Sequence, residues 1–77
     1  MTRGHFLSEP SRRIIYQLGV IQQRDMLHIR TFLLDVTHEN VGILTLMSLV
    51  SRMRANQGFA EAYCMGSYKK RVEEVAT

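Results

Sequence analysis

The sequence has few of the devices that usually reinforce a small domain. It has one cysteine, Cys64, in 77 residues, so no disulfide can form within the chain. The three histidines, His5, His28 and His38, have no short metal-ligand spacing with one another or with Cys64, whereas a structural zinc site needs four ligands. We therefore expect no metal and no cofactor. A chain of this length buries only about 60% of its unfolded surface, so self-association remains as the way to enlarge the core.

Long apolar runs and catalytic patterns are also missing. The most apolar stretch, 41–50, is shorter than the roughly 20 residues that a membrane-spanning helix needs. Residues 1–12 contain no apolar core of a signal peptide. No spacing fixes serine, histidine and acidic side chains in a catalytic order, and Cys64 is expected to be a small buried residue rather than a nucleophile. We expect a cytoplasmic protein that contacts no membrane and is not an enzyme.

Apolar residues recur at helical spacing through the first half of the chain. Ser8 is a good helix N-cap and Pro10 suits the first turn. The periodicity is interrupted over 20–25, so one long helix or two shorter ones cover 10–34. A short strand over 14–21 is the alternative, because β-branched residues are frequent there. The pattern predicts an all-α fold in a single domain, 1–77, in which residues 1–8 form a loose arm.

The segment 41–53 is predicted to form a long buried helix, with residues 37–40 as its cap. Its apolar residues surround most of the helix rather than forming one stripe, and so few other helices can hardly cover them all. We therefore predict a dimer, and expect its interface to contain Ile43, Leu46, Met47, Val50 and Met53. The alternative is a monomer in which Thr45, Ser48 and Ser51 mark a solvent-exposed face.

The net charge of +3 is unevenly distributed. Most of the basic residues lie at the two ends of the sequence, and between 52 and 71 a single acidic residue, Glu61, accompanies five basic ones. An excess of positive charge in a small domain is typical of proteins that bind nucleic acid or an acidic partner.

The last twenty residues, 58–77, have the pattern of a helix-turn-helix. Gly58 is expected to end the preceding helix, and short helices are expected over 59–65 and from 67 onward. Ala62 supplies the small residue at the helix crossing, and Gly66 can adopt the positive φ of the turn. The predicted DNA-binding residues are Ser67, Tyr68, Lys69, Lys70 and Arg71 of the second helix, with Arg52 and Arg54 ahead of the motif. The alternative is an ordinary helical hairpin with a solvated basic face, and Glu73 and Glu74 would repel phosphate if they faced DNA.

Two known families share short patterns with this chain. Arg54-Ala55-Asn56-Gln57, then Ala62, then Met65-Gly66 resemble the Fis-type DNA-bending proteins, although one extra residue separates Gln57 from Ala62. This resemblance implies a long dimer-forming helix that leads into a C-terminal helix-turn-helix. The segment 7–15 resembles the first helix of ArsR-type winged repressors, but no helix-turn-helix follows where that family places it.

These patterns together predict a dimeric DNA-binding transcriptional regulator. A two-fold dimer would present its recognition helices to successive major grooves of double-stranded DNA, about 34 Å apart. The alternative is a small helical adaptor or inhibitor that binds a protein partner through its apolar helix and basic end. A third possibility is a single-stranded nucleic acid ligand, for which Phe59, Tyr63 and Tyr68 are the stacking candidates.

Overall fold

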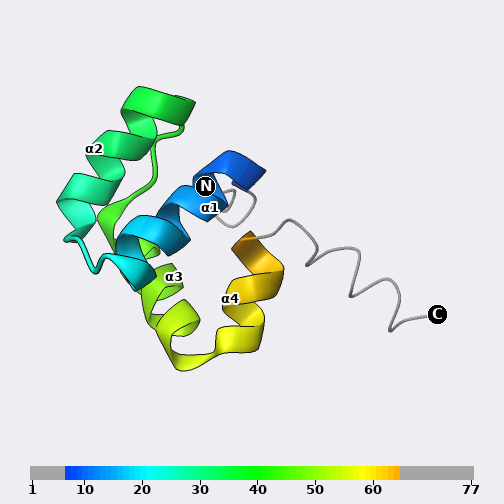
Figure 1. Ribbon diagram of the computed structural model, residues 1–77. Coiled ribbons are helices and arrows are strands. Elements are labelled where there is room, and N and C mark those ends of the chain that lie inside the picture. Colours follow the sequence, from blue (N-terminus) through cyan, green and yellow to red (C-terminus); the bar gives the residue numbers. More distant parts are fainter. Residues whose placement is uncertain (1–6, 65–77) are drawn as a thin grey trace.

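The computed structural model describes residues 7–64, which form an assembly of helices (Figure 1). The segments are α1 (Glu9–Ile15), η2 (Tyr16–Ile21), α2 (Met26–Thr37), α3 (Ile43–Ala55) and α4 (Gln57–Cys64). No strand occurs within 7–64, so the all-α prediction is confirmed and the alternative of a strand over 14–21 is wrong. The predicted recognition helix and most of the N-terminal arm lie outside the described residues.

The first helix begins at Glu9, with Ser8 as its N-cap, and continues without interruption from α1 into η2. The Ser8 side chain accepts a hydrogen bond from the Ser11 amide, and Pro10 occupies the first turn, as predicted. The second half, η2, is a π-helix, and just beyond it the amide of Arg24 donates to the carbonyl of Leu18 over 2.7 Å. The break predicted over 20–25 lies at 22–25, since η2 continues through Ile21, and Asp25 then caps α2 by accepting from the His28 amide at 2.8 Å. Two helices therefore cover this region, rather than one.

The core lies between α3 and the three other parts of the chain that pack against it: η2, α2 and α4. In Figure 1, α3 runs behind the first helix and turns at its lower end into α4. Apolar side chains of α1 and α2 meet those of α3 to form one buried cluster. Its members without solvent exposure, or nearly so, are Ile15, Ile29, Leu33, Leu46, Val50, Met53 and Ala60.

Three of the predicted dimer-interface residues belong to this core. Leu46, Val50 and Met53 are only 0%, 2% and 1% exposed within a single chain, so a second copy has no access to them. The prediction is wrong for these three, because the other helices cover one whole side of α3. Ile43 is half-buried and Met47 is exposed, and Ser48 and Ser51 mark a solvent-exposed face of α3.

The predicted helix boundaries around α3 need correction. Residues 37–40 do not cap α3: α2 continues through Thr37, and His38 ends it in the left-handed conformation with φ 63°. The N-cap of α3 is Gly42, and it makes no side-chain capping bond. Gly58 does not stop α3 but lies inside α4, since Asn56 ends α3 and its Oδ1 accepts from the Phe59 amide at 2.9 Å. One residue therefore separates these two helices.

Gly19 is the point at which the first helix approaches α3 most closely. A Cβ atom at this position would lie 2.7 Å from Cγ2 of Val50 and 3.4 Å from Cδ1 of Ile29. Both neighbours belong to the buried core, so neither side chain has free space to move into. A glycine is required here by the close approach of the two helices.

Gly19→Ala is expected to destabilise the protein by about 1–3 kcal/mol, the usual cost of adding a methyl group to a filled core. Gly58→Ala is the matched control, because the nearest atom that a Cβ at position 58 would meet in the described part of the chain is Asn56 Oδ1, at an ordinary 3.5 Å. Gly58→Ala should leave stability unchanged or raise it slightly, since alanine favours the helix. Urea unfolding followed by circular dichroism measures both free energies, and equal values for the two variants would contradict the packing described here.

Candidate functional site

Arg52 and Arg54 are the predicted DNA-binding residues that the structure describes, and both lie in the last turn of α3. Nη2 of Arg54 donates to the carbonyl of Gly19 over 2.7 Å, which ties α3 to η2. The guanidinium carbon of Arg52 lies 5.2 Å from the centre of the Phe59 ring on α4, within cation–π range. Both side chains are nevertheless exposed. A guanidinium has five N–H donors, so each arginine keeps donors that point to solvent.

The helix α4 corresponds to the first helix of the predicted helix-turn-helix. It begins at Gln57, two residues earlier than predicted, and Ala62 is buried, as a small residue at a helix crossing would be. The rings of Phe59 and Tyr63 stack with their centres 5.3 Å apart. The predicted base-contacting residues, Ser67 to Arg71, lie outside the described residues. The structure therefore brings Arg52 next to α4, the first helix of the predicted helix-turn-helix.

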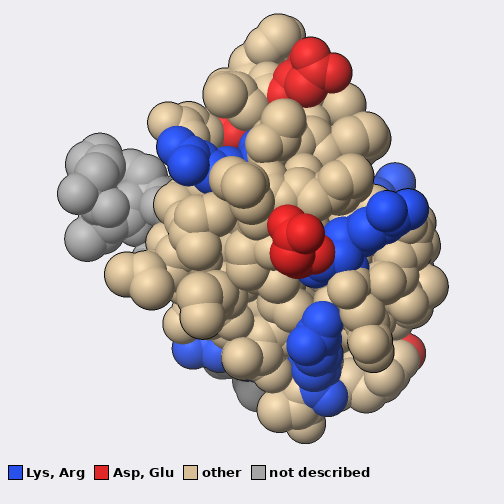
Figure 2. Space-filling model, turned by 90° about the vertical axis from the view of Figure 1, so that its left-hand side faces the viewer, with Lys and Arg blue, Asp and Glu red and all other residues tan. Residues whose placement is uncertain are grey.

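The described part of the protein is nearly neutral. It contains six arginines against five acidic residues, a net charge of +1 out of the total of +3. On the face shown in Figure 2, basic side chains lie in separate groups with acidic side chains among them. The remaining positive charge belongs to 1–6 and 65–77. An electrostatic surface for nucleic acid would therefore depend on a few residues rather than on a broad basic face.

A group of polar residues that the sequence analysis did not identify joins the start of α1 to the end of α2. We call Ser8, Ser11, Thr37 and Glu39 the polar clamp. The Glu39 carboxylate accepts from Ser8 Oγ at 2.8 Å and from the Ser8 amide at 3.3 Å. The fully buried Ser11 hydroxyl lies within hydrogen-bonding distance of the Glu39 carboxylate and, at 2.8 Å, of Thr37 Oγ1. These contacts join positions about thirty residues apart, which leave no local pattern in the sequence.

The clamp stabilises Glu39 in its charged form. Partial burial by itself raises the pKa of the Glu39 carboxyl. The hydrogen bonds from Ser11 and Ser8, together with the positive charge of Arg12, outweigh burial and lower the pKa below its ordinary value. Since an ionised carboxylate is an acceptor at all its lone pairs, it can satisfy the N-terminal donors of α1 and the Ser11 hydroxyl at once.

Two arginines of α1 bind backbone carbonyls at the end of α4. Nε of Arg12 donates to the carbonyl of Tyr63 over 2.8 Å, and its guanidinium lies 5.4 Å from the centre of the Tyr63 ring. Nε of Arg13 donates to the carbonyl of Cys64 over 3.3 Å, and Nη2 forms an ion pair with Glu9 at 2.6 Å. Cations favour the negative end of a helix. These two basic residues therefore hold α4 against α1.

The described residues contain no cluster of side chains that could bind a metal ion. Within 7–64, no three His, Cys, Asp or Glu side chains gather closely enough to hold a metal ion, and no helix is long and apolar enough to cross a membrane. Cys64 is buried, and that burial raises the pKa of its thiol, which makes it a poor nucleophile at neutral pH.

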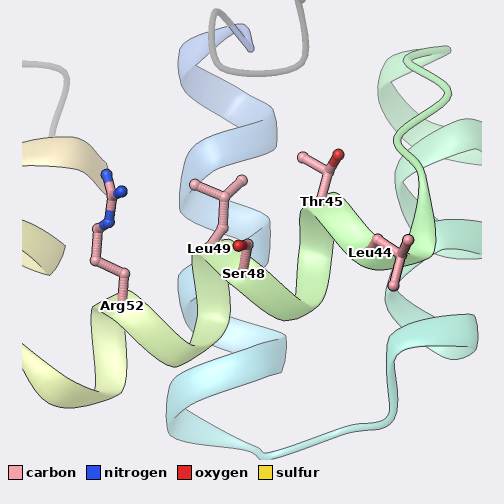
Figure 3. A pocket seen from close by; sticks show the side chains of 5 residues that line it. All are labelled: Leu44, Thr45, Ser48, Leu49 and Arg52. Atoms are coloured by element: carbon pink, nitrogen blue, oxygen red, sulfur yellow. The ribbon is translucent and has the colours of Figure 1, made fainter.

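An open hollow of about 240 Å³ runs along α3 (Figure 3). Its lining side chains among residues 7–64 come from this one helix: Leu44, Thr45, Ser48, Leu49 and Arg52. It combines apolar side chains and hydroxyls with one cation at its end.

Comparison with known proteins gives no relative for this chain: no family model matches, and neither the curated proteins nor the solved structures show significant similarity to it. The resemblances to Fis-type proteins and to ArsR-type repressors rest on the short segments quoted above. The function is therefore proposed from the residues of this chain and their geometry.

Glu39→Gln is expected to destabilise the protein at neutral pH by about 1 kcal/mol, because it removes the charge that strengthens the hydrogen bonds from Ser8 and Ser11. The loss is modest, since the hydrogen bonds from Ser8 are exposed to solvent. The folded-state pKa of Glu39 is lowered, so the charged clamp stabilises the fold above the ordinary pKa of 4.5. This contribution is lost as the pH falls from there through the lower folded-state pKa. The difference in unfolding free energy between wild type and variant should shrink over that interval.

The matched control is Asp35→Asn, a similar loss of charge on the exposed surface of α2. The Asp35 carboxylate makes no hydrogen bond or ion pair with the described residues. Its removal should change the unfolding free energy at neutral pH by no more than roughly a few tenths of a kcal/mol. If Glu39→Gln behaved like this control at neutral pH, the polar clamp would have no stabilising role.

Proposed function

We propose that this protein is a DNA-binding transcriptional regulator that acts as a dimer through a C-terminal helix-turn-helix. The observation that carries the proposal is the junction of α3 and α4. There two exposed arginines, Arg52 and Arg54, end one helix, and a short helix with a buried Ala62 follows after a single residue. The sequence then continues into the basic segment 67–71. A short helix with a small buried residue, followed by a glycine and a basic helix, is the order found in helix-turn-helix elements.

The basic residues would divide into two roles in such a complex. Arg52 and Arg54 each have donors that remain exposed to solvent, and their attachment to α4 and η2 fixes where those donors lie. Contacts of this kind to phosphate oxygens position a protein on DNA without reading its sequence. Lys69, Lys70 and Arg71, with Ser67 and Tyr68, have the side chains that can donate to guanine O6 and N7 or to phosphates.

The low net charge of residues 7–64 allows the salt dependence of DNA binding to be predicted. Since 7–64 carries a net charge of only +1, DNA affinity should depend on the few basic residues named above. Each phosphate that they neutralise contributes a slope of about −0.9 to the dependence of log K on log salt. The salt dependence of binding therefore counts the contacts that each variant removes.

Lys69→Ala/Lys70→Ala is expected to weaken binding to a mixed-sequence DNA duplex and to make the salt slope shallower by about 1 to 2, as two phosphate contacts would. Arg24→Ala/Arg30→Ala removes the same charge from the loop before α2 and from α2 itself, and should leave the slope almost unchanged. Fluorescence anisotropy across a salt series measures both variants against the wild type. Circular dichroism confirms that each remains folded.

Two outcomes would contradict the proposal. A folded wild-type protein that binds no duplex even at low salt would exclude a DNA-binding function. Equal effects of the two double variants would show that binding depends on net charge and not on the predicted element. The alternative function, an adaptor or inhibitor that binds a protein, predicts that changes at the exposed Met47 abolish partner binding and that the basic residues matter far less.

A further inference from the structure

One exposed side of α3 has no partner among residues 7–64. Five residues define it, and we call them the α3 stripe: Leu44, Met47, Ser48, Ser51 and Ala55. Their spacing places them along one side of the helix, away from the buried core side. Leu44 is 80% exposed and Met47 is 49% exposed. Leaving a leucine side chain in water forfeits about 1.5–3 kcal/mol relative to burying it.

We propose that a second copy of this chain packs on the α3 stripe, with the two α3 helices antiparallel and a two-fold axis between Ser48 and Ser51. The proposal deepens the proposed function, since it names the surface and the partner for the dimer. It also replaces the predicted interface, of which Leu46, Val50 and Met53 lie in the core of a single chain.

The sizes of the side chains favour an antiparallel pair. The stripe has large residues at its start, Leu44 and Met47, and small ones further along, Ser48, Ser51 and Ala55. An antiparallel partner places Leu44 of one copy opposite Ala55 of the other, so that a large side chain fills the space above a small one at both ends. The two serines at the centre let the helices approach to the usual 8–10 Å between axes. A parallel pair would oppose large to large and leave a gap at the small end.

The charges favour the same arrangement. The stripe carries no charged side chain, and α3 contains no acidic residue at all. Arg52 and Arg54 flank the stripe at its C-terminal end, where contacts with Phe59 and Gly19 hold them. An antiparallel pair offsets the two copies of Arg52 by about 8 Å and the two copies of Arg54 by about 14 Å along the axis of the 13-residue helix, comparable to the screening length of about 10 Å at moderate salt. A parallel pair would bring all four arginines together.

The length of α3 sets the strength of this contact. Two helices of about 20 Å that cross once bury less than the roughly 800 Å² per partner of a standard stable interface. We therefore expect a weak dimer, with a dissociation constant in the micromolar range, whose population depends on protein concentration. Sedimentation velocity of the full chain without DNA, from low micromolar to near-millimolar concentration, should show a monomer–dimer equilibrium.

Met47→Lys should weaken this dimer at least tenfold, because the two-fold axis places each new cation opposite Arg52 of the other copy, where like charges repel. Leu27→Lys is the matched control, since Leu27 is similarly exposed, at 62%, but lies on α2. It should leave the dimer unchanged. If both variants weakened it equally, or if Met47→Lys had no effect while folded, the α3 stripe would not be the interface.

Cysteine cross-linking tests the orientation of the helices. In a Cys64→Ala background, Leu44→Cys mixed with Ala55→Cys should give a disulfide-linked dimer of the two variants on mild oxidation. Leu44→Cys alone should give none, because an antiparallel pair offsets the two copies of position 44 by about 16 Å along the helix axis, whereas a disulfide needs Cα atoms within about 7 Å. Cross-linking of Leu44→Cys to itself would overturn the antiparallel arrangement.

The two proposals fail in different experiments. A wild-type protein that stays monomeric at every concentration overturns the self-pairing of the α3 stripe and points to a different protein as its occupant. That result says nothing about DNA, since no DNA is present. Conversely, a dimer that binds no duplex in the anisotropy titration keeps the α3 stripe as its interface and removes the helix-turn-helix function.

Discussion

The close approach of the first helix to α3 at Gly19 is the constraint on which the rest of the fold depends. Because no side chain separates the two backbones there, Val50 packs directly on η2, and the Gly19 carbonyl comes within reach of Arg54. The same approach lets Ile15, Ile29 and the buried side of α3 form one cluster. A domain of this size has a small core, so the loss of one well-packed crossing removes a large share of its stability.

Hydrogen bonds outside the apolar core also hold the helices together. The polar clamp ties the start of α1 to the chain just beyond α2, and Arg12 and Arg13 tie α1 to the last carbonyls of α4. The first helix is thus in contact with every other part of the described chain. Its two arginines, Arg12 and Arg13, are consequently engaged in holding the fold.

The helical class, the capped start at Ser8 and the break over 22–25 could be predicted from the sequence, since capping and periodicity are local. The side of α3 that faces the core could not be predicted, because a helix that is apolar on most sides gives no indication of which side is buried. The prediction that Gly58 ends α3 was wrong, since Asn56 both ends α3 and caps α4. In the candidate site, Arg54 was selected for its charge alone, and its bond to a carbonyl 35 residues away is visible only in three dimensions. Glu39 could not be identified from the sequence either, because its partners Ser8 and Ser11 lie about thirty residues away along the chain.

The single-residue junction at Asn56 has a mechanical consequence. Only the two backbone torsions of one residue connect α3 to α4, and the Asn56 side chain restricts them by its bond to the Phe59 amide. A rotation of α3 about its own axis is therefore expected to rotate α4 with it. Any partner that binds the outer side of α3 would thereby also influence the orientation of α4.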